Sequence, residues 1–218
     1  MNRCVHIFGG IGTKFSHYKH AIEVYKSNHY TIHFYENKYI TCCIPKKYNK
    51  LVNSALKNDR HGTIVHVNSG GFWPGLAYQS QTTQNKLFIC EASPLENDIH
   101  KFIDSFEKIY KQKCPTFLIP HASKIGKFIE MPLKTTDPEW TNQLNKNISN
   151  IPNLINIVSK NDNVIDRSYI DFAMKLTKNN NNHAEQYVFN GGSHQNVSKS
   201  DTTRYQEILQ MQLDKLTK

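Results

Sequence analysis

The chain has 218 residues, of which 38% are hydrophobic and 21% are charged, so it is long enough to bury one sizeable core and too apolar to be disordered. No stretch approaches the roughly 18 apolar residues of a membrane-spanning helix, and the N-terminus lacks the apolar segment of a signal peptide, so we expect an intracellular protein. The net charge of +9 comes from scattered lysines and not from a basic run, so it gives no strong signal for nucleic acid.

Short apolar runs of strand length alternate along the chain with longer segments of helical pattern. We expect strands at residues 4–8, 30–35, 63–67, 87–91, 154–159 and 185–189, and helices at 16–27, 46–57, 75–83, 95–112, 167–178 and 202–216. Several of the strands are continuous apolar runs, as in parallel strands that are buried on both faces. The alternation predicts one α/β domain over residues 1–218, with about six mostly parallel strands and helices on both faces of the sheet.

Residues 114–153 interrupt this alternation. The segment contains five prolines and has weak periodicity, and it is too long for an ordinary connection within an α/β domain. We expect it to be an insertion that forms a lid or cap.

Open parallel sheets bind ligands at the carboxyl ends of their strands, so the residues that follow each strand are the first candidates for a site. Residues 66–71 read His-Val-Asn-Ser-Gly-Gly, and Ser69 lies between a strand and a helix, as the nucleophile of a strand–turn–helix elbow does. Gly71 meets the need for a small residue two positions after the serine, whereas Val67 occupies a position where glycine is usual. The alternative is a glycine-rich turn in which the serine has no chemical role.

A glycine-rich loop follows the first strand, with the sequence Gly9-Gly10-Ile11-Gly12. Such a loop can direct a backbone N–H of Gly10 or Ile11 at an oxyanion, and Gly70, next to the serine, can supply a second N–H. The alternative is a tight turn that requires permissive residues. Nucleotide binding is a weaker interpretation, because neither a GxGxxG pattern nor a P-loop sequence is complete.

Two further candidates follow the last two strands. Asp162 is placed to orient a histidine, with Asp166 nearby as a second choice; the alternative is an ordinary turn aspartate. His194 follows two glycines after the sixth strand, where a general base is required, although a single histidine is more often a surface residue. The chain order Ser69, Asp162, His194 is that of α/β-hydrolases, which favours this fold and a catalytic triad.

The cysteines and the other histidines give no sign of a metal site. The five cysteines form no CxxC pair and have no zinc-finger spacing with histidines, so we expect reduced thiols. His17 and His20 share a helical face but have no acidic or thiol companions. We therefore expect no metal and no cofactor.

These motifs resemble the transmembrane protein 53 family, a eukaryotic branch of α/β-hydrolase-like proteins. The shared features are a His-Val-x-Ser-x-Gly-Gly elbow, an opening Gly-x-x-Gly turn with a Lys/Tyr-rich helix, a Ser/Pro segment, and the segments of the acid and the histidine. The elbow lies here at residues 66–71, the turn at 9–12 and the helix at 18–25. The Ser/Pro segment lies at 92–94, the segment of the acid at 159–164 and that of the histidine at 193–194. The resemblance implies an α/β-hydrolase fold with Ser69, Asp162 and His194 at the triad positions, and a place in the cytoplasm, at an internal membrane or at the nuclear envelope.

We therefore expect a serine hydrolase that acts on an ester or thioester of a small or lipid-like molecule. His194 would deprotonate Ser69, Asp162 would hold the imidazolium, and the lid would shape an acyl pocket. Three alternatives remain open: an acyltransferase that uses the same triad, a non-catalytic binding or scaffold protein on a hydrolase fold, and a nucleic-acid-binding protein.

Overall fold

The computed structural model describes residues 3–37, 45–60, 62–93, 138–162, 167–180, 182–192, 194 and 196–217. Strands and helices alternate through these ranges. The strands are β1 (Cys4–Ile11), β2 (Thr31–Asn37), β3 (Thr63–Asn68), β4 (Asn85–Glu91), β5 (Asn153–Ser159) and β6 (His183–Phe189). The helices are α1 (Lys19–Ser27), α2 (Pro45–Lys57), α3 (Phe72–Gln79), α6 (Pro138–Ser149), α7 (Arg167–Asn179), α8 (Val197–Ser200) and α9 (Thr202–Lys215), with short 3-10 helices η1 (Phe15–Tyr18) and η3 (Ser69–Gly71) before α1 and α3.

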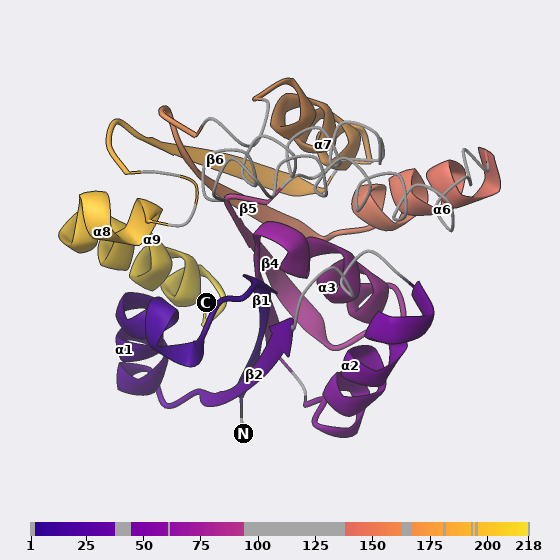
Figure 1. The fold of residues 1–218 in the computed structure, drawn as a ribbon, viewed down its shortest axis with the longest axis horizontal. Coiled ribbons are helices and arrows are strands. Elements are labelled where there is room, and N and C mark those ends of the chain that lie inside the picture. Colours follow the sequence, from indigo (N-terminus) through magenta and orange to yellow (C-terminus); the bar gives the residue numbers. More distant parts are fainter. Residues whose placement is uncertain are drawn as a thin grey trace, which may run out of the picture.

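The strands form one parallel sheet with the order β2-β1-β3-β4-β5-β6, which Figure 1 shows running through the middle of the molecule. Every residue of β3 is buried, and so is every residue of β5 after the first. Burial on both sides explains why these strands are nearly continuous apolar runs. The prediction of about six parallel strands with helices on both faces is confirmed.

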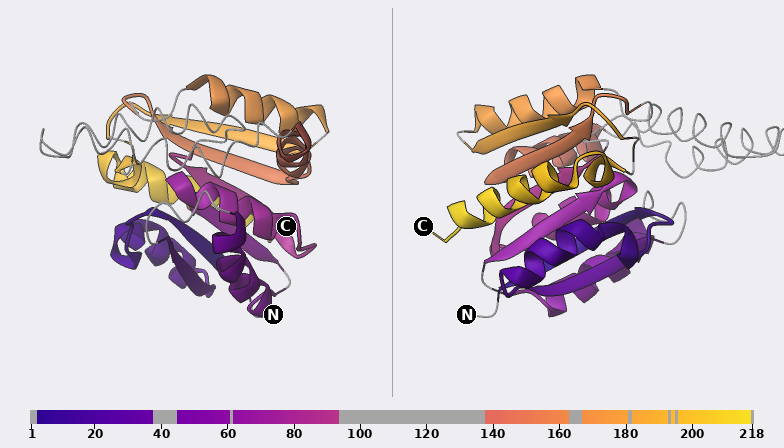
Figure 2. Two further views of the ribbon diagram at one scale, coloured as in Figure 1. Left: turned by 45° about the vertical axis from the view of Figure 1, so that its right-hand side comes forward. Right: turned by 90° about the vertical axis from the view of Figure 1, so that its left-hand side faces the viewer.

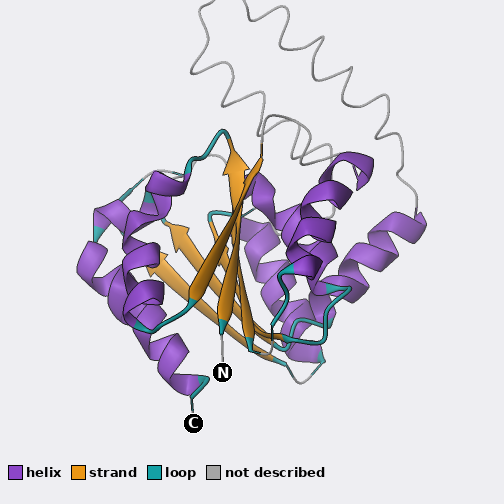
Figure 3. Ribbon diagram, turned by 90° about the horizontal axis from the view of Figure 1, so that it is seen from below, coloured by secondary structure: helices purple, strands orange, loops and turns teal. Residues whose placement is uncertain are grey.

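The helices divide between the two faces of the sheet (Figure 3). α1 packs against α9 on one face, whereas α2, α3, α6 and α7 cover the other. Figure 2 shows α1 and α9 side by side, although they lie at opposite ends of the chain. Adjacent side chains of β1 point to opposite faces of the sheet. Ile7 packs in the hydrophobic cluster under α1 and α9, and Phe8 packs in the cluster on the other face.

The C-terminal helix α9 illustrates how the sequence forms these layers. The Asp201 side chain accepts the N–H of Arg204 and caps the start of the helix. The buried residues then recur at helical spacing, on one side of the helix only; they are Tyr205, Ile208, Leu209, Gln212 and Leu213. In the described part of the chain, no helix combines the length and the apolar character that crossing a bilayer requires.

The order of the strands reverses at β1, which lies between β2 and β3. The chain leaves β1 toward one edge of the sheet and comes back to β3 on the other side of β1. Such a reversal leaves a crevice beyond the carboxyl ends of the two strands, where α/β proteins bind their ligands. The glycine-rich end of β1 and the turn of Ser69 after β3 both lie at this point.

The end of β1 differs from the prediction. The strand continues past Phe8 to Ile11, because Ile11 pairs with Asn37 of β2 beyond a bulge. The Asn37 side chain donates to the Gly9 carbonyl over 2.8 Å, and the backbone carbonyl of Asn37 accepts the N–H of Gly12 over 3.1 Å. The glycine-rich segment is thus the final part of a strand that β2 holds in place.

The segment expected to be a lid, residues 114–153, is in part a helix of the main domain. Residues 138–149 form α6, which packs against α7 and α3, and Ile148 and Ile151 are fully buried in the core. Residues 138–153 therefore belong to the sheet and its covering helices. The rest of the expected lid, residues 114–137, and the helix expected at 95–112 lie outside the described residues.

Candidate active site

Ser69 occupies a sharp turn between β3 and the 3-10 helix η3 that leads into α3. Its φ of +47° lies in the left-handed region, which costs a residue with a side chain about 1–3 kcal/mol. Gly70, the next residue, is buried. A strained serine between a strand and a helix is the backbone geometry of a nucleophile elbow. The structure places Ser69 where the sequence predicted, directly after β3.

Two glycines let the chain after Ser69 pass close to its neighbours. A Cβ on Gly71 would overlap the carbonyl oxygen of Phe8 in β1, so a larger residue would require the backbone to move. A Cβ on Gly75, in α3, would overlap Cγ1 of Val67. Gly75 thus makes room for the valine that stands where an elbow usually has glycine. This contact was not predicted; its signal in the sequence was a glycine inside an apolar helix.

The glycine-rich end of β1 lies against the turn of Ser69. A Cβ on Gly10 would lie 2.9 Å from Cβ of Ser69, a separation that side chains do not tolerate. The following residues turn sharply, since Gly12 has a φ of +71° and the N–H of Thr13 donates to the Gly10 carbonyl over 3.1 Å. Gly10 therefore lies directly beside the serine.

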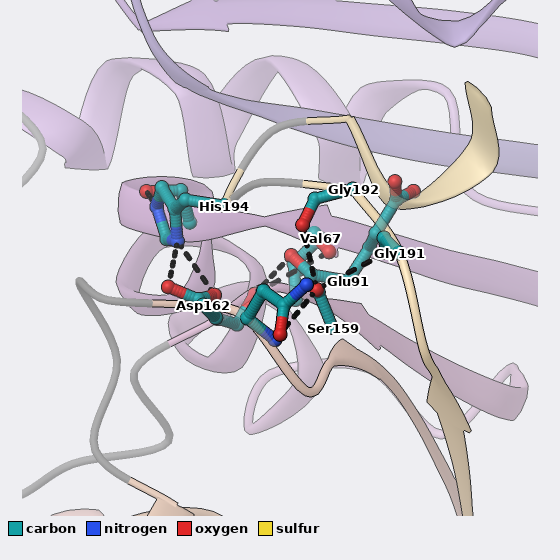
Figure 4. A network of polar contacts seen from close by, with 10 residues as sticks. Val67, Glu91, Ser159, Asp162, Gly191, Gly192 and His194 are labelled. Atoms are coloured by element: carbon teal, nitrogen blue, oxygen red, sulfur yellow. Dashed lines mark hydrogen bonds and ion pairs between the residues drawn. The ribbon is translucent and has the colours of Figure 1, made fainter. Parts of the chain in front are cut away.

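His194, from the loop after β6, forms a hydrogen bond with Ser69 and lies next to Asp162. Ser69 Oγ lies 2.9 Å from Nε2 of the imidazole. On the other side of the ring, Nδ1 lies 2.9 and 3.2 Å from the two carboxylate oxygens of Asp162, which follows β5 (Figure 4). The structure thus brings together the three residues that the sequence singled out. Asp166, the second choice for the acid, lies outside the described residues.

The hydrogen bonds of His194 are shielded from water, and the charge of the carboxylate determines which imidazole nitrogen donates. The side chains of His194 and Asp162 are 8% and 5% exposed, so water competes little for their hydrogen bonds. When Asp162 is ionised, its carboxylate can only accept, so Nδ1 of His194 then donates and Nε2 is left as an acceptor for the Ser69 hydroxyl. This tautomer is the one that a general base requires.

A second buried polar cluster lies near the elbow, on the face that α1 and α9 cover. Glu91, at the end of β4, accepts from the Tyr205 hydroxyl over 2.9 Å and lies 3.3 Å from Nε2 of His66. Nδ1 of His66 lies 2.9 Å from the Tyr25 hydroxyl. Burial, reinforced by the charge of Glu91, raises the pKa of Tyr25 and Tyr205 well above the usual value, so both stay protonated. The cluster anchors α1 and α9 to β3 and β4.

The two cysteines that the structure describes, Cys4 and Cys90, are buried in strands of the sheet. Burial raises the pKa of the thiols of both Cys4 and Cys90, which keeps them protonated and poorly nucleophilic. Among the residues that the structure describes, no three histidine, cysteine, aspartate or glutamate side chains are grouped as metal ligands would be.

Comparison with solved structures identifies the fold. The structure is similar to the esterase Pf2001 of Pyrococcus furiosus, with a TM-score of 0.72 and 14% identity over 98% of this chain and 83% of that one. A bromoperoxidase from Bacillus anthracis has a TM-score of 0.62 and 13% identity over 98% and 92% of the two chains. A monoacylglycerol lipase of Paleococcus ferrophilus has a TM-score of 0.59 and 12% identity over 95% and 93%. No family model matches the sequence, and a search of curated proteins finds no match.

The chain therefore has the α/β-hydrolase fold that the order of Ser69, Asp162 and His194 predicted. At such low identity the likeness shows the fold alone, because one fold hosts many activities. The narrower resemblance to the transmembrane protein 53 family has no support from a family model or a curated relative, and it stays a prediction.

Proposed function

We propose that this protein is a serine hydrolase that cleaves an ester or thioester bond in a small or lipid-like molecule. The observation that carries the proposal is the chain of hydrogen bonds from Ser69 through His194 to Asp162. A serine hydroxyl is a weak nucleophile until a base removes its proton, and the base must be oriented by a third group. The contact of Ser69 with His194 supplies the base, and the contact of His194 with Asp162 orients it.

The reaction has two halves. In the first, Nε2 of His194 takes the proton of the Ser69 hydroxyl while Oγ bonds to the acyl carbon; the bond to the leaving group then breaks, and the leaving group takes that proton. In the second, His194 deprotonates a water molecule whose oxygen bonds to the acyl carbon; the bond from that carbon to Ser69 Oγ then breaks, Oγ takes the proton from His194, and the acid is released. Asp162 stabilises the imidazolium in both halves without taking the proton itself.

Backbone N–H groups would stabilise the oxyanion of the tetrahedral intermediate. Gly70 follows the serine at the first helical turn, where N–H groups have no partner within the helix. The glycine-rich end of β1 would supply a second N–H from Gly10 or Ile11, because Gly10 lies against Ser69. In other hydrolases, loss of one such donor lowers turnover by roughly 100- to 1,000-fold.

Labelling with a fluorophosphonate probe tests the proposal, because only an activated serine reacts quickly. We expect wild-type protein to be labelled and Ser69→Ala and His194→Ala to lose both labelling and p-nitrophenyl ester hydrolysis, by several orders of magnitude. Ser198→Ala is the control, because Ser198 is also buried but lies in α8, and it should keep both activities.

The other outcomes of this test are informative. Folded wild-type protein that is not labelled would contradict the proposal and favour a binding or scaffold role on the same fold. Labelled protein that forms a new ester when an alcohol acceptor is added would instead favour acyl transfer at the same serine.

We also propose the narrower assignment to the transmembrane protein 53 family and an intracellular location. Their support is the pattern of residues 9–12 and 66–71, together with the order of the three site residues. Imaging of the tagged protein in eukaryotic cells tests the location. We expect signal in the cytoplasm, at an internal membrane or at the nuclear envelope, and secretion would contradict it.

A further inference from the structure

Ser159, the last residue of β5, connects the loop that carries Asp162 to the loop that carries His194. Ser159 is 6% exposed. Its Oγ lies 2.8 Å from the carbonyl oxygen of Gly192 and 3.1 Å from that of Gly191, both in the loop after β6 (Figure 4). The same oxygen accepts the N–H of Asn161 over 3.0 Å. The single proton of the hydroxyl is therefore shared between two carbonyls, and one of its two lone pairs accepts an amide N–H.

Backbone bonds fix the Asp162 side of this connection. The N–H of Lys160 donates to the Phe189 carbonyl over 2.8 Å and extends the pairing of β5 with β6 beyond Ser159. The N–H of Asp162 donates to the Ser159 carbonyl over 3.2 Å and closes the turn. The backbone of Asp162 is thus held at the end of β5.

The His194 side turns through two glycines. Gly192 has a φ of +87°, and a Cβ there would lie 2.8 Å from the carbonyl oxygen of Asn196. Glycine permits many backbone conformations, so a loop built on two of them needs outside contacts to keep one. The Ser159 hydroxyl supplies such a contact at the carbonyls of both glycines.

We propose that Ser159 is a positioning residue for the triad, whose hydroxyl fixes the loop of Gly191 and Gly192 and so sets the separation of His194 from Asp162. The effect on turnover rests on the proposed function, whereas the effect on the imidazole does not. Supporting hydrogen bonds hold reacting side chains in a productive geometry, and a misplacement of about 1 Å can cost on the order of 100-fold in rate.

Three substitutions at Ser159 separate the hydroxyl from the packing. Ser159→Ala removes the donor, Ser159→Cys keeps a similar volume with a weaker donor, and Ser159→Thr keeps the hydroxyl. For ester hydrolysis we expect kcat of the alanine variant to fall by roughly 10- to 100-fold while KM changes by less than about twofold. The cysteine variant should show a smaller fall in kcat, and the threonine variant should keep most of the wild-type value.

Thr177→Val is the matched control for lost stability. Thr177 is fully buried in α7, and its hydroxyl also bonds to two backbone carbonyls, those of Ala173 at 3.0 Å and Ile148 at 3.4 Å. We expect a lower melting temperature with kcat within about twofold of wild type. Equal losses of kcat in Thr177→Val and Ser159→Ala would overturn the proposal, and so would a wild-type kcat in Ser159→Ala.

Proton NMR tests the positioning without turnover. A His194 Nδ1 proton that a carboxylate holds gives a resonance at low field, and its exchange with water reports how often the contact opens. We expect Ser159→Ala and, to a smaller degree, Ser159→Cys to broaden this resonance or lose it, while Ser159→Thr and Thr177→Val keep it. If wild-type protein does not react with the fluorophosphonate, the proposed function fails, yet an unchanged resonance in Ser159→Ala would still overturn the positioning role.

Discussion

Ser69 has a φ of +47°, a left-handed backbone conformation that a serine rarely adopts in an unfolded chain. The cost of about 1–3 kcal/mol is offset by close packing on both sides of the turn. Gly71 lets the helix start against the Phe8 carbonyl, and Gly10 lets the end of β1 lie against the serine. These contacts hold the hydroxyl within 2.9 Å of Nε2 of His194. Strain at this residue is thus part of how the hydroxyl is presented to its base.

The role of Asp162 can be tested by a change of one atom. Asp162→Asn keeps the shape of the side chain but can present an N–H to Nδ1 of His194, which favours the wrong tautomer of the imidazole. We expect the second-order rate constant of fluorophosphonate labelling to fall by on the order of 10,000-fold, with an unchanged circular dichroism spectrum. Asp171→Asn, at an exposed position of α7, should label at the wild-type rate. A variant at Asp162 that also labels at the wild-type rate would assign the acid to another residue.

The identity of the three site residues could be predicted because each follows a strand, and parallel strands end at one edge of the sheet. Their separations in the chain did not matter to that argument. Ser159 could not be singled out in the same way, because a serine at the end of a strand is ordinary. The carbonyls that its hydroxyl bonds lie 32 and 33 residues further along the chain. Such a contact follows from the register of β5 with β6, which the sequence does not specify.

At the scale of the elements, the contact between β3 and α3 determines how the elbow is built. The turn usually needs glycine two residues before the nucleophile so that the helix can approach the strand. Here Val67 keeps its side chain, which is fully buried, and Gly75 gives up a side chain opposite it. The helix can still approach the strand closely because the glycine of this contact lies in α3 and not in β3.

Gly75→Ala tests this compensation. The added methyl group would overlap Cγ1 of Val67, and overpacking of this kind costs about 1–3 kcal/mol, more than the roughly 1 kcal/mol that alanine gains over glycine in a helix. We expect a lower free energy of unfolding in urea and slower fluorophosphonate labelling. Val67→Ala alone should also destabilise the protein, by opening a cavity.

The double variant Val67→Ala/Gly75→Ala supplies the decisive comparison. It should be more stable than the sum of the single effects predicts, with a coupling of about 0.5–3 kcal/mol, because each change makes room for the other. Additive effects would mean that the two positions do not share the contact.

The boundaries of elements were less predictable than their type. Proline density indicated an insertion over residues 114–153, yet Pro138 is the first residue of α6, where a missing N–H costs nothing, and Pro152 lies just before β5. Both prolines mark the beginnings of regular elements. β1 extends beyond its apolar residues because the Asn37 side chain and a bulge continue its pairing with β2. Local composition carries neither kind of information.

At the scale of the whole molecule, the edge strand β6 is tied to the C-terminal helix through Glu185. Its carboxylate accepts from Nζ of Lys215 over 2.5 Å and from Nε2 of Gln212 over 2.8 Å, and it also bonds to His183 and Tyr187. Burial alone would raise the pKa of Glu185, but these hydrogen bonds outweigh it and lower the pKa to about 2. Because α9 also packs on α1, this cluster connects the last strand to the first helix through a single layer.

The pH dependence of stability tests this connection. The pKa of Glu185 lies below its ordinary value of 4.5, so the ionised carboxylate stabilises the fold above that value, and the contribution is lost as the pH falls from about 4.5 to about 2. We expect Glu185→Gln to melt at a lower temperature than wild type near neutral pH, and the difference to shrink as the pH falls through this window. Glu207→Gln, at an exposed position of α9, should differ little from wild type at any pH. A difference for Glu185→Gln that stays constant through the window would mean that the charge of Glu185 does not hold β6 to α9.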